Sequence, residues 1–167
     1  MTQQTQLSPS PLAIVRHEFT SIRLEASEAT NPMGELQLKT RRSLEKDVED
    51  DNHWRLTLTI EFGPNAADAP APYSGAITIV GSFRIAEGYP QEKHRVLVNV
   101  TAASILYGAC REMLVNLTAR STHGILSLPS ISFVPPEGPE ENVAAPPQKT
   151  GSKGNTAKRV RRKSGDA

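Results

Sequence analysis

The segment HWRLTLTIEFG, residues 53–63, alternates strictly between apolar and polar side chains. Its apolar positions are Trp54, Leu56, Leu58, Ile60 and Phe62. Since successive side chains of a strand point to opposite faces of a sheet, this alternation predicts a strand that is half buried. Sheets that keep one face toward solvent are typically antiparallel, so the segment favours an antiparallel sheet with one covered face.

Three further segments of the chain have strand character. LAIVRHEFTSIRLEAS changes its alternating phase near Thr20 and Ser21, which predicts a strand interrupted by a bulge. GELQLKTRRSLEKDVEDDN offers a strand that starts through Leu36 and Leu38 and runs into charged residues. YSGAITIVGSFRIAEG keeps its apolar residues in one phase on both sides of Gly81, so we expect one long strand with the glycine at a kink.

A helix is predicted after the four strands, within SILYGACREMLVNLTARSTHG, residues 104–124. Ser104 is a suitable N-cap and Gly124 is suitable just past the last turn, while YPQEKHRVLVNVTAA is expected to be an extended or partly helical lead. One apolar stripe at helical spacing consists of Leu106, Cys110, Met113 and Leu117. A stripe this wide must bury more than one side, so we expect the helix to pack on the sheet and on another copy of the chain.

The two ends of the chain differ from its middle. Residues 1–11 are polar with two prolines, and residues 135–167 are rich in proline, glycine and charge without periodicity, so both are expected to be disordered. Residues 12–134 are expected to form one domain. It closes with the apolar segment ILSLPSISF, which Pro129 restricts to an edge or a surface groove.

The C-terminal end is basic. Five of six consecutive residues carry a positive charge, namely Lys158, Arg159, Arg161, Arg162 and Lys163. Such a cluster can neutralise phosphates and so bind nucleic acid or an anionic surface, or it can simply keep the chain soluble. The absence of interleaved aromatic residues argues against sequence-specific recognition.

The sequence offers no constellation for catalysis. Cys110, the single cysteine, lies inside the apolar stripe, where a thiol behaves as a small hydrophobe, and His123 suits the end of a helix. No phosphate loop, nucleophile elbow or metal-ligand spacing occurs, so we predict a protein that is not an enzyme and that needs no cofactor or metal. One cysteine and the absence of an apolar run of about 20 residues predict a reduced, cytoplasmic chain without a membrane span.

The segment SILYGACREMLVNLTARSTHGILSLPSISF resembles the corresponding region of the SecB export chaperones. Both have an apolar opening, an A-x-R-E step, a helix that ends in an Arg-Ser-Thr turn, and a final strand of alternating apolar residues around a proline. In this chain these are Ala109, Arg111 and Glu112, then Arg120, Ser121 and Thr122, then Leu126, Leu128, Pro129, Ile131 and Phe133. The order of four strands and a long helix also agrees, and the resemblance covers about residues 12–134.

The resemblance implies an α+β fold, with a four-stranded antiparallel sheet and a long helix packed on it. It further implies assembly through the helices into a homotetramer, a dimer of dimers, and ATP-independent holding of unfolded proteins or preproteins for export. Candidate residues of the client-binding groove, which the sequence does not separate from the core, are Trp54, Phe83, Leu126, Leu128, Ile131 and Phe133.

The chain departs from the family at the positions that present acidic residues to the SecA motor. Glu25 matches one such position, but Ser21 stands where an Asp is expected and Ala76 where a Glu is expected. The C-terminal helix of typical members is replaced by a proline-rich segment. Two other functions therefore stay open: a dedicated chaperone of the antitoxin in a toxin–antitoxin pair, and polyanion binding through the basic end.

Overall fold

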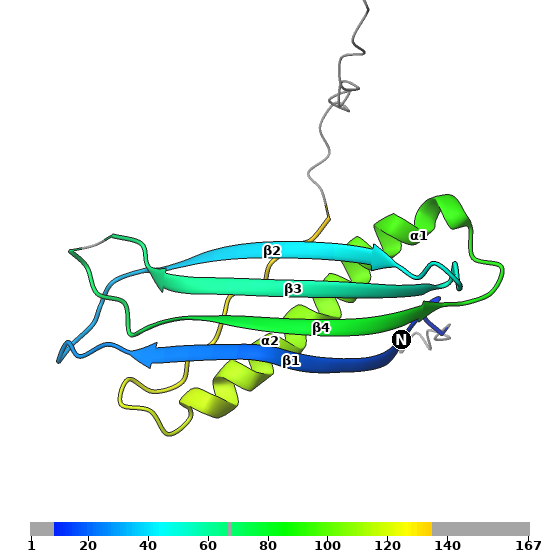
Figure 1. Ribbon diagram of the computed structural model, residues 1–167. Coiled ribbons are helices and arrows are strands. Elements are labelled where there is room, and N and C mark those ends of the chain that lie inside the picture. The colour runs from blue at the N-terminus through cyan, green and yellow to red at the C-terminus, as the bar shows by residue number, and fades with distance from the viewer. Residues whose placement is uncertain (1–8, 67, 135–167) are drawn as a thin grey trace, which may run out of the picture. The chain divides into compact units, whose positions relative to one another are not determined.

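The computed structural model describes residues 9–66 and 68–134 of the chain. In these ranges four strands form one antiparallel sheet in the order β1-β4-β3-β2, and a helix follows them (Figure 1). The strands are β1 (Leu12–Ala26), β2 (Leu36–Lys46), β3 (His53–Pro64) and β4 (Tyr73–Ile85). The predicted α+β fold, with a helix packed on a four-stranded antiparallel sheet, is confirmed.

Strands β3 and β4 form the centre of the sheet. Leu58 lies opposite Ile79 and Ile60 opposite Ile77, and all four side chains are fully buried on the inner face. The polar residues between them face the other way and are at least partly exposed. The alternation in residues 53–63 therefore predicted both the strand and its buried face.

Strand β1 contains two register shifts, one between Ile14 and Arg16 and one between Phe19 and Ser21. The second confirms the predicted bulge, and the first was not anticipated. Because each bulge adds one residue, apolar residues an odd number of positions apart on either side of a bulge point to the same side of the sheet. Ile14 and Phe19 accordingly pair with inward-facing residues of β4, as does Ile22 beyond the second bulge.

The helix begins earlier than the sequence predicted. Its parts are α1 (Gln91–Leu97), a π-helical turn η1 (Val98–Ala102) and α2 (Ala103–Thr118). Ser104 therefore is not an N-cap, and its hydroxyl instead donates to the carbonyl of Val100, 2.7 Å away. Pro90 immediately precedes the first turn, where its fixed φ of −56° suits a helix start.

The helix also ends earlier than predicted, at Thr118. The Thr118 hydroxyl donates to the Leu114 carbonyl at 2.6 Å and accepts the backbone N–H of Leu126 at 2.8 Å. This side chain thus ties the last turn to the segment that returns after it. Gly124 does adopt a positive φ of 76°, but it lies in the turn beyond the helix and does not cap it.

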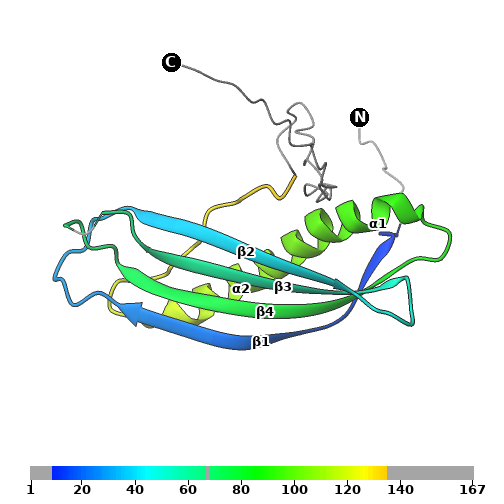
Figure 2. The ribbon, with the colours of Figure 1, turned by 45° about the horizontal axis from the view of Figure 1, so that its top comes forward.

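Helix α2 crosses the back of the sheet diagonally, from the side of β2 toward β1 (Figures 1 and 2). Gly81 of β4 lies beneath it, and a Cβ atom there would stand 2.8 Å from the Leu106 side chain and 2.6 Å from that of Phe83. The glycine therefore permits close approach of helix and sheet, within a strand that continues unbroken to Ile85. In the described ranges no helix is long and apolar enough to cross a membrane.

Candidate functional site

After α2 the chain returns in extended form along the inner face of the sheet, and we call residues 124–134 the strap. It runs beside α2 across the back of the sheet, from Tyr73 of β4 at its start to β2 at its end (Figure 1). On the helix side Tyr107 packs edge-to-face against Phe133, with ring centroids 5.8 Å apart. On the strand side the Arg42 guanidinium of β2 lies 5.1 Å from the centre of the Phe133 ring. Both walls of this groove therefore contact the strap.

The strap fills its groove with alternate side chains. Leu126, Leu128 and Phe133 are buried, Ile131 is partly buried, and Ile125 points outward with 61% of its surface exposed. Pro129 shifts the alternation, so the inward positions are spaced by two, three and two residues. The predicted apolar extended segment is therefore present, and it is seated in a groove of its own chain.

The backbone of the strap is held by side chains and by no strand ladder. The Tyr107 hydroxyl donates to the Pro129 carbonyl at 2.6 Å, and Arg111 Nε donates to the Leu128 carbonyl at 2.9 Å. Tyr73 of β4 donates to the Gly124 carbonyl. Among residues 9–66 and 68–134 no backbone-to-backbone hydrogen bond joins the strap to a strand.

Two residues predicted to line a client groove lie in the core. Phe83 is fully buried beneath Leu106, and Trp54 is 9% exposed, with its indole N–H donating to the Asp51 carbonyl at 3.2 Å. Both belong to the inner face of the sheet, where the helix covers them. Leu126, Leu128 and Phe133 of the strap are buried to a similar degree and Ile131 is partly buried, so client binding by any of these positions stays a prediction.

The helical stripe predicted to join two copies of the chain contains both buried and exposed residues. Leu106 and Cys110 have no exposed surface and pack against the sheet of their own chain, so the interface prediction is wrong for them. Met113 is partly buried and Leu117 is 46% exposed. Burial raises the pKa of the Cys110 thiol to about 12, so the thiol stays protonated and acts as an apolar group.

Exposed apolar side chains gather on the side of α2 away from the strap. Ile105 and Leu117 of the helix are exposed, as are Ile14 and Ile22 on the inner face of β1. Residues advance about 100° around a helix at each step, which places Ile105 and Met113 across from Tyr107 and Arg111. We call this surface the β1 flank, because the end of α2 emerges beside that strand (Figure 1).

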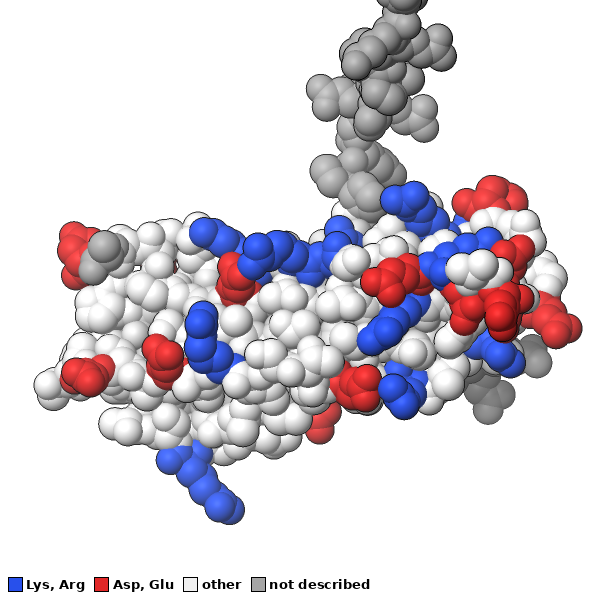
Figure 3. Space-filling view, in the orientation of Figure 1, with Lys and Arg blue, Asp and Glu red and all other residues white. Residues whose placement is uncertain are grey.

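The open face of the sheet is polar and carries charges of both signs (Figure 3). Pairing of β1 with β4 places Ser21, Arg23 and Glu25 on this face opposite Thr78, Ala76 and Ser74. The three positions at which the resemblance implies motor docking are therefore neighbours, but only Glu25 among them is acidic.

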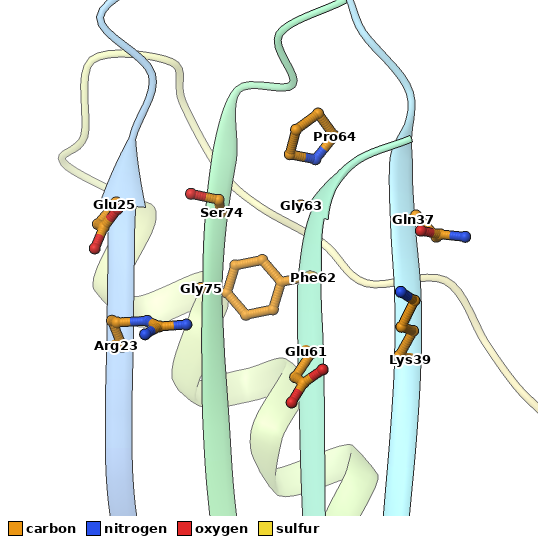
Figure 4. Close-up of a pocket in the computed structure, with 10 residues that line it drawn as sticks. All are labelled: Arg23, Glu25, Gln37, Lys39, Glu61, Phe62, Gly63, Pro64, Ser74 and Gly75. Atoms are coloured by element: carbon orange, nitrogen blue, oxygen red, sulfur yellow. The ribbon is translucent and has the colours of Figure 1, made fainter. Parts of the chain in front are cut away.

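A hollow of about 470 Å³ lies over this part of the open face (Figure 4). Arg23 and Lys39 stand on strands at opposite edges of it, and Glu61, which pairs with Arg41, lies between them. The sequence analysis did not anticipate this hollow. Small residues on the two central strands, Gly63 and Ser74, leave the space open, and their effect depends on cross-strand pairing that the sequence does not reveal.

Cys110 and His123 do not form a catalytic pair in the structure. The His123 Nε2 atom lies 2.7 Å from the Ser27 carbonyl oxygen and its ring packs edge-on against Tyr73, whereas Cys110 faces the buried core. Over the described residues no three His, Cys, Asp or Glu side chains gather as a metal site. The basic cluster Lys158–Lys163 falls outside the described residues.

The sequence matches no family model and no curated protein. Among solved structures, the Rv1957 SecB-like chaperone of Mycobacterium tuberculosis, in complex with a ChAD peptide from the Rv1956 HigA1 antitoxin, is similar with a TM-score of 0.58. The identity is 15%, over 73% of this chain and 91% of that one. A protein of unknown function from Streptococcus agalactiae matches with a TM-score of 0.43 and 12% identity, over 71% of this chain and 97% of that one.

The first of these similarities shows that the chain has a SecB-like fold. The resemblance read from the helix and the following apolar segment is thereby confirmed at the level of the fold.

Proposed function

We propose that this chain is an ATP-independent holdase that binds unfolded proteins or preproteins through apolar surfaces beside α2. The observation that carries the proposal is the SecB-like fold, shared with a chaperone whose structure contains a bound peptide. The apolar strap packed beside α2 adds support, because it is an extended segment whose apolar side chains and backbone carbonyl make contacts that a client could also make.

The physical chemistry of a holdase requires only such surfaces. Apolar burial contributes about 25 cal/mol per Å² and is non-directional, so selectivity for client sequence is low. Hydrogen bonds to client carbonyls add affinity without adding selectivity, since every residue carries one. We assign client binding to the groove in which Leu126, Leu128, Ile131 and Phe133 of the strap lie.

We further propose that copies of the chain assemble through the β1 flank, with Met113 and Leu117 at the contact, into a dimer of dimers. Exposed apolar side chains that lie side by side are typical of such interfaces. Several client sites on one tetramer bind different segments of the same unfolded chain, which raises avidity because each later contact is intramolecular.

The test of both proposals measures suppression of aggregation and the mass of the chain in solution. Denatured citrate synthase is diluted into buffer with and without the full chain while light scattering is followed, and the chain is sized by chromatography with in-line mass determination. Suppression by a species of about 72 kDa, four times the 18.1 kDa chain, is expected. An unchanged scattering curve at stoichiometric amounts would refute the holdase proposal, and a monomer would refute the assembly.

A second candidate function is a dedicated chaperone for one antitoxin. The observation that favours it is the antitoxin peptide in the complex of the structurally similar Mycobacterium tuberculosis chaperone. Glu25 stands without the other two acidic docking positions, which gives less support to delivery of preproteins to SecA in the cytoplasm. Side-by-side binding assays with an antitoxin encoded next to this chain and with SecA decide between them, because each candidate requires one of the two partners.

Polyanion binding through Lys158–Lys163 is a separate proposal that rests on composition alone. Deletion of residues 148–167 should abolish binding of the chain to a labelled DNA duplex. Equal binding by the full and the shortened chain would exclude it.

A further inference from the structure

The contacts of the strap are of a kind that any extended polypeptide can make. Tyr107 and Arg111 donate to the carbonyl groups of Pro129 and Leu128, and Thr118 accepts the backbone N–H of Leu126. All three helix side chains bind main-chain atoms of the strap. Neither the position nor the chemistry of these two donors and one acceptor depends on which side chains the bound segment carries.

The groove is specific instead for a spacing of apolar side chains. Leu126, Leu128 and Phe133 are buried in it, and Ile131 is partly buried. A segment with large apolar residues at positions i, i+2, i+5 and i+7 therefore reproduces the contacts of the strap. Aromatic residues suit the last position, because Tyr107 and Arg42 contact that ring from two sides.

The strap is also separable from the rest of the fold. It contributes no strand to the sheet, and the sheet and α2 form their own hydrogen bonds without it. It starts at Gly124, whose positive φ marks a turn, and Leu126 and Leu128 follow directly. Release of the strap would break its four side-chain hydrogen bonds and expose the buried side chains Leu126, Leu128 and Phe133, while the strand pairing of the sheet does not depend on it.

We propose that the groove in which the strap lies, beside α2 on the inner face of the sheet, is a binding site for an extended apolar polypeptide segment, and that the strap occupies it in the free protein as an intramolecular competitor. A client segment then binds there by displacing the strap and taking over the same donors. This inference rests on the proposed holdase function and adds to it the location of the site and its competitor.

Replacement of the strap by a client segment changes the free energy of the complex little. The client forms the contacts that the strap loses, so the net gain is small, and the tethered strap competes at a high effective concentration. The apparent affinity for a client is reduced by the fraction of molecules in which the groove is free. Weakening the strap without altering the groove must therefore tighten client binding.

The experiment uses Phe133→Ala, which weakens the strap, and Ile125→Ala as the matched control, since that side chain points outward. The probe is a fluorescein-labelled peptide of residues 124–134, GILSLPSISFV, titrated against each full-length chain by fluorescence anisotropy. The Phe133→Ala chain is expected to bind it about tenfold or more tightly than the unaltered chain, and Ile125→Ala to bind as the unaltered chain does. Equal or weaker binding by Phe133→Ala would show that the strap is a wall of the site, which overturns the proposal.

A second measurement needs no variant and covers the case in which Phe133→Ala does not fold. Hydrogen exchange of the unaltered chain is followed with and without denatured citrate synthase. Displacement of the strap predicts faster exchange at the Leu126 N–H, which is bonded to Thr118 in the free protein. Slower exchange there, in a chain that suppresses aggregation, refutes displacement while the holdase function stands. A chain that neither suppresses aggregation nor binds the peptide refutes both.

Discussion

The effect of a Gly81→Ala substitution on folding stability depends on how closely α2 approaches the sheet. A methyl group there would lie 2.6 Å from Phe83 and 2.8 Å from Leu106. Both neighbours are fully buried, so neither can move without disturbing the core. We expect Gly81→Ala to destabilise the chain by about 1–3 kcal/mol, the usual range for an overpacked core, less the fraction of a kcal/mol that replacing a strand glycine returns.

Gly108 of α2 provides the matched control. It lies on the exposed side of the helix, and a Cβ atom there meets nothing within 4 Å. The same substitution, Gly108→Ala, should stabilise the chain by about 0.5–1 kcal/mol because alanine has the higher helix propensity. Glycine-to-alanine changes in adjacent elements are therefore expected to act in opposite directions.

Urea denaturation followed by circular dichroism measures both effects at one protein concentration, since an oligomer would make the midpoint concentration-dependent. Adding Leu106→Ala to Gly81→Ala removes one of the two close neighbours, so the double variant should be more stable than the sum of the single effects by at least about 0.5 kcal/mol. A Gly81→Ala chain as stable as the unaltered one would refute the packing of α2 on β4 described above.

Three further predictions concern the helix. Tyr107→Phe leaves the Pro129 carbonyl without its donor and should cost about 1–2 kcal/mol in urea denaturation, whereas no loss would mean that the hydroxyl does not hold the strap. Because burial raises the pKa of Cys110 to about 12 from the ordinary 9.0, its stabilising contribution is complete below pH 9 and is lost as the pH rises toward 12. Cys110→Ala should remove that part of the pH dependence, and a thiol reagent at pH 8 should label the unaltered chain only in denaturant. Leu117→Asp places a charge on the β1 flank and should lower the mass seen in solution, while an unchanged mass would show that assembly uses another surface.

The strands were the most predictable part of the fold. The pattern in residues 53–63 separates water-facing from core-facing positions at every step, because each side chain of a half-buried strand meets one environment or the other. The start of the helix was missed because α1 has no side-chain cap and its sequence, QEKHRVL, carries little apolar periodicity. That segment continues directly into α2 through the π-helical turn, whose Val98 and Ala102 are buried in the core.

The assignment of apolar residues to core or surface was only partly predictable. Helical spacing places Leu106 and Leu117 on one stripe, but the sequence does not tell how far the sheet extends beneath it. Because α2 crosses the sheet diagonally, Leu106 lies over the central strand β4 and Leu117 lies near the edge, where nothing in the described chain covers it. The same limit applies to Trp54 and Phe83, whose burial depends on where the helix lies.

The proposed holdase would release its client through equilibrium alone, and the proposed competition by the strap would give it a means of doing so. A groove deep enough to bury Leu128 almost completely would retain an apolar client for a long time if it stood empty. A tethered segment with the same apolar spacing competes continuously, since its effective concentration does not depend on how much client is present. Under this proposal it would lower the affinity to the range in which a client can leave and fold, and in the free protein it would cover apolar surface that otherwise favours aggregation. On this argument, strengthening the match between strap and groove would weaken client binding even though the groove itself were unchanged.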